Sequence, residues 1–205
     1  MNSWEGCARA QVGDARTHAS AYRSGSMVED ATPQPPTGER LALLRRLGFG
    51  ELTHDSHVPF LSHLLGTRRV LVEWGSRPAL CDAGLFHSAY GTEYFPVDRP
   101  ADRDDVRAVI GDEAEQIAWV WCTIVRDTIE LTDPGSAIDR TTQARLALTD
   151  AMVADIATLW AADTVEQLDR MAPDERDFAL GLGRVLHRAS PAAQAAAAPV
   201  IAGLG

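Results

Sequence analysis

The stretch SHLLGTRRVLVEWGSRPALCDAGLFHS, residues 62–88, carries two helical patterns in succession and a histidine near each end. From Phe60 to Trp74, apolar side chains recur at spacings of three or four, which is typical of a helix with one buried face. After a glycine, Pro78 favours the start of a second helix, which we expect to end near His87. The pair of helices indicates a helical fold.

The same helical periodicity recurs along the rest of the chain. We find no alternating strand pattern of useful length and no internal repeat, so we predict an all-α bundle of about six or seven helices. The expected helices span roughly 37–47, 56–74, 78–87, 111–131, 139–163 and 173–189. We predict a poorly ordered extension over 1–36, a helical domain over 37–190 and an alanine-rich tail over 191–205.

Composition excludes several classes of function. The formal charge of −10 disfavours nucleic acids and anionic membranes as partners. All 19 basic residues are arginines, which excludes mechanisms that need a lysine, such as a Schiff base or a P-loop. The sequence lacks an apolar run long enough to span a membrane, and its three cysteines are widely spaced. We therefore expect a cytoplasmic protein.

Four of the six histidines fall within 34 residues: His54, His57, His63 and His87. Histidine is the commonest metal-binding side chain, and such clustering is what a site built between helices requires. We expect His63 to reach inward, His87 to lie at the end of the next helix, and His57 to lie at the mouth of the pocket in a catalytic role. The alternatives are a packed core histidine and, for His57, a helix cap.

Two carboxylates are candidates to complete this site. Asp155 lies on the apolar stripe of the helix expected over 139–163, where burial is costly unless the group binds a cation or a hydrogen-bond donor. Glu93 lies close to His87 in sequence. The alternatives for Asp155 are an ion pair with an arginine such as Arg145 or Arg126, or a place at the edge of the stripe, in which case Asp150 is the next candidate.

The segments HLLGT (63–67), AGLFHS (83–88) and MVADIATLW (152–160) resemble the HD-domain superfamily, a group of all-α metalloenzymes. The resemblance implies an HD-like domain over 37–190 and metal ligands at His63, His87 and Asp155. More narrowly, AGLFHSAYGTE is similar to a family of uncharacterised proteins within that superfamily.

One departure from the superfamily pattern affects the expected metal site. The superfamily has an aspartate directly after its second histidine, and this sequence has Ser88 there. No histidine lies between Ser88 and Asp155, so the usual two-metal site cannot form in its standard way. We therefore expect one divalent ion (Fe, Mn, Zn or Co), with His57 or Glu93 as a further ligand.

Three functions are compatible with these features. The first is metal-dependent hydrolysis of a phosphoester or nucleotide-like small molecule, with Arg68 or Arg126 holding phosphate. The second is a mononuclear non-heme iron oxygenase, with Trp74 and Tyr94 lining its pocket. The third is a non-catalytic binding module, for which the supporting feature is Ser88.

The loop after His87 supplies the remaining candidates. The hydroxyl groups of Ser88, Tyr90 and Thr92 can donate hydrogen bonds to a substrate or to metal-bound water, and Tyr90 can act as a general acid. The alternative is that they only cap a helix end. The expected partner is a small-molecule substrate, and the sequence is also compatible with a homodimer.

Overall fold

A computed structural model describes residues 36–50, 59–170 and 176–204. The described helices are α1 (Gly38–Arg46), α2 (Phe60–Glu73), α3 (Pro78–Leu85), α4 (Arg103–Ile110), α5 (Asp112–Thr123), α6 (Asp150–Gln167), α7 (Arg176–Leu182) and α8 (Pro191–Leu204). Two short 3-10 helices cover Leu168–Arg170 and Leu186–Arg188. None of the described helices is long and apolar enough to cross a membrane. The predicted extension over 1–36 falls almost wholly outside the described residues.

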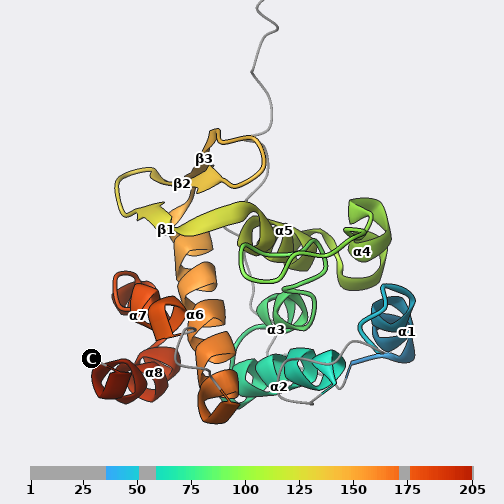
Figure 1. The fold of residues 1–205 in the computed structure, drawn as a ribbon, viewed down its shortest axis with the longest axis horizontal. Coiled ribbons are helices and arrows are strands. Elements are labelled where there is room, and N and C mark those ends of the chain that lie inside the picture. The colour runs from blue at the N-terminus through green and yellow to red at the C-terminus, as the bar shows by residue number, and fades with distance from the viewer. Residues whose placement is uncertain (1–35, 51–58, 171–175, 205) are drawn as a thin grey trace, which may run out of the picture. The chain divides into compact units, whose positions relative to one another are not determined.

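The chain is mostly helical but not purely all-α, which corrects the predicted fold class. A three-stranded antiparallel sheet, in the order β1-β2-β3, is formed by β1 (Ile124–Glu130), β2 (Gly135–Asp139) and β3 (Arg145–Leu148) (Figure 1). The sequence of β1, IVRDTIE, is rich in β-branched residues, and its burial partly alternates along the strand. The helix expected over 111–131 therefore ends at Thr123.

The next expected helix is also shorter at its start, because residues 135–148 belong to the sheet. The chain enters α6 at Thr149, whose hydroxyl accepts a hydrogen bond from the backbone N–H of Met152 at 3.1 Å. This N-cap replaces the expected start near residue 139. At its other end α6 continues to Gln167, four residues beyond the expected end.

Helix α6 is the central element of the described helices. It packs against α2, α3 and α5 on one side and against α7 and α8 on the other, as its place between these helices in Figure 1 shows. Its residues are therefore buried almost all around, from Met152 to Thr164. The alanine-rich tail forms α8 and packs on α6, where small side chains allow close approach.

The close contact of α2 with α3 depends on Gly84. A Cβ atom at this position would lie 2.4 Å from Cδ1 of the fully buried Leu71 on α2. Because the interior around the fully buried Leu71 is closely packed, glycine allows α3 to approach α2 this closely without displacing that side chain. His87 follows three residues later, so this contact brings the end of α3 beside α2.

Candidate metal centre

His63 and His87 meet in the protein interior. His63 projects from the first turn of α2, and His87 lies in the turn that follows α3; their exposed fractions are 4% and 3%. The two Nε2 atoms are 3.1 Å apart, and the rings meet edge to face. The structure thus brings together the two histidines that the sequence paired.

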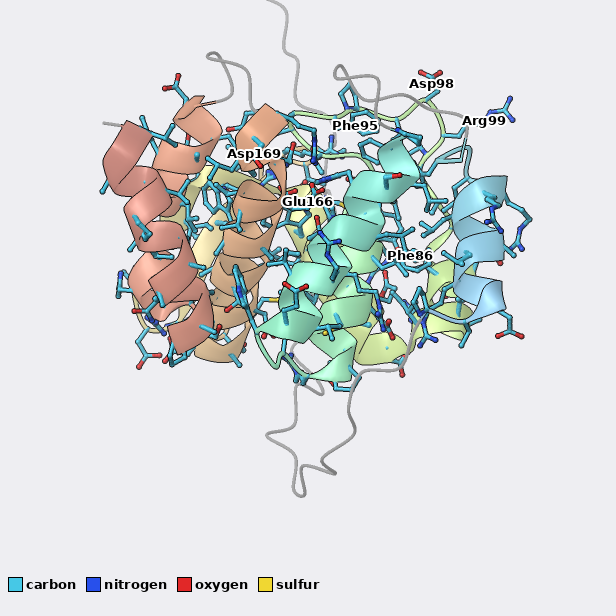
Figure 2. The ribbon with its side chains drawn as sticks, turned by 90° about the horizontal axis from the view of Figure 1, so that it is seen from below. Phe86, Phe95, Asp98, Arg99, Glu166 and Asp169 are labelled. Atoms are coloured by element: carbon cyan, nitrogen blue, oxygen red, sulfur yellow. The ribbon has the colours of Figure 1, made fainter. Side chains whose placement is uncertain are left out.

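The opposite nitrogen of each ring has a fixed partner. Nδ1 of His87 lies 2.6 Å from the carbonyl oxygen of Gly84, which can only accept, so this Nδ1 carries a hydrogen. Nδ1 of His63 lies 2.6 Å from Oε2 of Glu166, between α6 and α2 (Figure 2). Arg170 binds the same carboxylate. Although burial opposes it, the hydrogen bond and charge of His63, and after them those of Arg170, keep the pKa of Glu166 below its usual range. In the neutral rings, both Nε2 atoms therefore present lone pairs to one another.

Asp163 on α6 supplies a carboxylate at this point. Its Oδ1 lies 3.2 Å from Nε2 of His63 and 3.5 Å from Nε2 of His87. The side-chain amide of Gln167, one turn later, donates to the same oxygen at 2.8 Å and orients the carboxylate. Among the described residues, His63, His87 and Asp163 form a buried group whose ligand atoms all lie within 4.8 Å of one another, and this group could hold one metal ion.

The charges of the centre favour a cation between the three groups. Burial lowers the pKa of His63, but the hydrogen bonds and charges of Asp163 and Glu166 outweigh it and raise that pKa to about 9. Burial lowers the pKa of His87 to about 4. The pKa of Asp163 lies below its usual value, because the histidine charges outweigh the effect of burial. Two facing nitrogens beside an ionised carboxylate thus bind either a proton or a metal ion.

The spacing of the three atoms matches a metal coordination shell. At metal–ligand bonds of about 2.1 Å, neighbouring ligands are separated by roughly 3.0 Å at a right angle and roughly 3.4 Å at the tetrahedral angle. The observed separations of 3.1, 3.2 and 3.5 Å are close to this range. The ligand set of two imidazoles and one carboxylate suits Zn, Fe, Mn or Co.

Asp155, the carboxylate that the sequence suggested as the third group, lies outside this cluster. Asp155 does lie on the buried side of α6, but both of its oxygens are 2.6 Å from the guanidinium of Arg77, just before α3. The structure thus realises the ion-pair alternative, with Arg77 as the partner in place of Arg126. Asp163 lies eight residues further along α6, at the level of the two histidines.

The other candidate ligands and catalytic groups do not join the described cluster. Glu93 pairs with Arg126, with 2.5 Å between Oε1 and the guanidinium. Ser88 is buried beside His87 in the turn after α3. His57 lies outside the described residues. A catalytic role for Ser88 or His57 stays a prediction.

Tyr90 and Thr92 have structural partners. The hydroxyl of Tyr90 donates to the buried Glu115 at 2.9 Å; burial and this carboxylate raise the pKa of Tyr90 far above its usual value. The hydroxyl of Thr92 accepts hydrogen bonds from two backbone N–H groups of its own loop, at 3.2 and 2.9 Å. Neither contact caps a helix end, and the contact with Glu115 gives Tyr90 little tendency to release its proton.

The four predicted substrate-binding residues lie in different surroundings. Arg68 is buried and contacts Asp82 at 3.5 Å. Trp74 ends α2 and is partly exposed, and Tyr94 is 55% exposed. Arg126 is 2% exposed and stacks over Trp121.

The sequence did contain a signal for Asp163. The apolar stripe Met152, Ile156, Leu159 continues at the same spacing to Asp163 and Glu166. Asp163 was the last residue of the expected helix, whereas α6 runs one turn further, and the stripe also contains Asp155, from which Asp163 could not be distinguished.

Comparison with known proteins adds one match. Residues 43–126 match the model of a family described as a domain of unknown function, DUF6817. The matched region includes both histidines and ends before Asp163, and it covers less than half of the chain. No curated protein and no solved structure matches. Because the family description names no activity, membership of the HD-domain superfamily stays a prediction.

Proposed function

We propose that the chain is a metal-dependent enzyme with a mononuclear centre formed by His63, His87 and Asp163. The observation that carries this proposal is the pair of Nε2 atoms, 3.1 Å apart and both facing one carboxylate oxygen. Two neutral imidazoles whose Nδ1 atoms are both protonated repel each other in this arrangement unless a proton or a metal ion lies between their Nε2 atoms, and a metal ion takes the place of the proton on His63.

The residues around the ligands support metal binding. Metal-binding histidines usually donate their second N–H to a carbonyl or carboxylate, which fixes the tautomer and the ring orientation. Gly84 and Glu166 provide these acceptors at 2.6 Å each.

Three protein ligands support a catalytic role in preference to a structural one. Structural zinc sites normally use four protein ligands, whereas catalytic sites use three and leave a position for water or substrate. A divalent ion in such a site lowers the pKa of bound water and polarises an ester or phosphoryl oxygen. We propose hydrolysis of a small phosphoester or nucleotide-like substrate, in line with the HD-domain resemblance.

Metal analysis of the purified protein tests the proposal. We expect one equivalent of zinc, manganese, iron or cobalt in the wild-type protein. It should be absent from the variants His63→Ala, His87→Ala and Asp163→Asn. His187→Ala is the matched control, because His187 is exposed on a short 3-10 helix. Failure to bind any of the four metals at one equivalent would overturn the proposal.

A second candidate rests on the ligand set itself. Two histidines and one carboxylate with open positions are also the ligands of mononuclear non-heme iron oxygenases. Iron as the bound metal, with oxygen consumption on addition of substrate, would favour this candidate. Zinc, manganese or cobalt with phosphoesterase activity would favour hydrolysis.

A further inference from the structure

Two buried N–H groups near the candidate metal centre lack a hydrogen-bond partner among the described residues. They are Nε1 of Trp121 and Nε of Arg126. Both groups can only donate, so turning the side chain in place cannot convert them into acceptors. Leaving a donor buried and unsatisfied is costly, so a pair of them in one place calls for an acceptor.

The two donors belong to one stacked pair. The guanidinium carbon of Arg126 lies 4.0 Å from the centre of the Trp121 ring. The aromatic rings of Trp160 and Phe178 lie further out, at 5.8 and 5.3 Å from the same carbon. This surrounding excludes water from the pair and strengthens any interaction with an anion.

The same tryptophan connects this pair to the metal centre. The rings of Trp121 and His87 meet edge to face with 6.2 Å between their centres. Trp121 thus packs nearly perpendicular to the His87 ring, and the guanidinium of Arg126 stacks over its face. An acceptor held by the stacked pair would therefore lie beside the group formed by His63, His87 and Asp163.

The guanidinium of Arg126 makes an ion pair through only one of its three nitrogens among the described residues. Glu93 binds one terminal nitrogen of the guanidinium and leaves Nε without a partner. The site therefore combines the positive charge of Arg126 with two N–H donors, neither of which bonds to a described residue.

We infer that Arg126 and Trp121 form an oxyanion-binding subsite beside the metal centre. This inference rests on the proposed function and adds a point of attachment to it: Arg126 and Trp121 hold an anionic group of the substrate, a phosphate or a carboxylate. The anion accepts from Nε of Arg126 and Nε1 of Trp121, while the bond to be cleaved lies toward His63, His87 and Asp163. A substrate with no acceptor group at this point would leave both donors unsatisfied.

Titration calorimetry with inorganic phosphate, and separately with acetate, tests the subsite on metal-loaded protein at constant ionic strength. We expect saturable binding of at least one of the two anions, at one site per chain. Trp121→Phe keeps an aromatic ring but removes the N–H, and Arg126→Lys keeps the charge but removes Nε. Each should weaken anion binding about tenfold or more, with unchanged metal content.

The chain offers a matched control in a second stacked pair. The guanidinium of Arg103 lies 4.3 Å from the ring of Trp119, but its nitrogens are bound by Glu115 and Gln116. Trp119→Phe and Arg103→Lys should leave anion affinity within about twofold of wild type. Equal weakening in both pairs would overturn the inference, since it would indicate a general loss of packing.

If a variant fails to fold, NMR spectroscopy of the wild-type protein still tests the subsite. The indole N–H groups of the five tryptophans give separate nitrogen–proton resonances. One of them should shift on saturation with the anion. No saturable binding, or no shifted indole resonance, would overturn the subsite even where the metal binds. Anion binding by a protein that takes up no metal would support the subsite and overturn the proposed function.

Discussion

At the scale of single residues, the candidate centre depends on the protonation of His63. In the metal-free protein its pKa is about 9, so the ring is protonated at neutral pH and its Nε2 cannot bind a metal ion. A metal ion and a proton therefore compete for the same nitrogen.

We predict that metal binding at pH 7.5 releases about one proton. Because His63 loses its proton on binding, the apparent affinity should rise roughly tenfold per pH unit up to about pH 9 and then level off. Calorimetry in two buffers with different ionisation enthalpies measures the number of protons released. Binding with no proton release would contradict the raised pKa of His63.

A second prediction concerns Glu166, which positions His63 without being a candidate ligand. Glu166→Gln removes the negative charge that holds the Nδ1 hydrogen, so metal affinity should fall about tenfold or more. Competition with a chromophoric chelator measures the change. Glu113→Gln is the control, because Glu113 is also paired with an arginine, Arg77, outside the centre. Equal losses in the two variants would argue against a positioning role.

At the scale of secondary-structure elements, the ion pair of Asp155 with Arg77 joins α6 to the start of α3. Asp155→Asn should destabilise the fold by about 2 kcal/mol, since it weakens two charge-assisted hydrogen bonds. It should leave metal content unchanged, whereas Asp163→Asn should abolish metal binding. Urea denaturation and metal analysis of the two variants provide the measurements. Loss of metal from Asp155→Asn would restore Asp155 as a candidate ligand.

The close approach of α2 and α3 gives another prediction. Gly84→Ala places a Cβ atom against the buried Leu71 and should cost about 1–3 kcal/mol of stability. Metal affinity should fall as well, because the shift of α3 moves His87 away from His63. In the control Gly38→Ala, at the start of α1, the new Cβ meets nothing within 4 Å, and stability should hardly change. Thermal denaturation compares the two variants.

The elements also show what the sequence could predict. The end of α2 and both ends of α3 follow from local signals, namely apolar periodicity and Pro78, and were predicted to within two residues. The start of α2 was not, since the helix begins at Phe60, with Pro59 as its N-cap, and not near residue 56. The sheet was not predicted, because IVRDTIE follows a helix without a break and its apolar residues fit a helical period as well as a strand. Only pairing with β2, more distant in sequence, selects the strand.

At the scale of the whole described molecule, the centre joins segments far apart in sequence. His63 and His87 come from neighbouring helices, and their pairing could be predicted from spacing. Asp163 lies 76 residues beyond His87, on a helix buried almost all around, so the stripe alone could not distinguish it from Asp155. Its place depends on how α6 crosses α2, which is a property of the packed fold.

Because the three groups come from α2, the turn after α3 and α6, a bound metal ion should stabilise the whole fold. A ligand that binds only the folded state adds about 2.7 kcal/mol at a concentration of one hundred times its Kd. We predict that the melting temperature rises with metal concentration and falls on chelation. In His87→Ala this dependence should vanish, and in the exposed-histidine control His187→Ala it should remain. A metal-dependent rise in His87→Ala equal to that of wild type would place the binding site elsewhere in the chain.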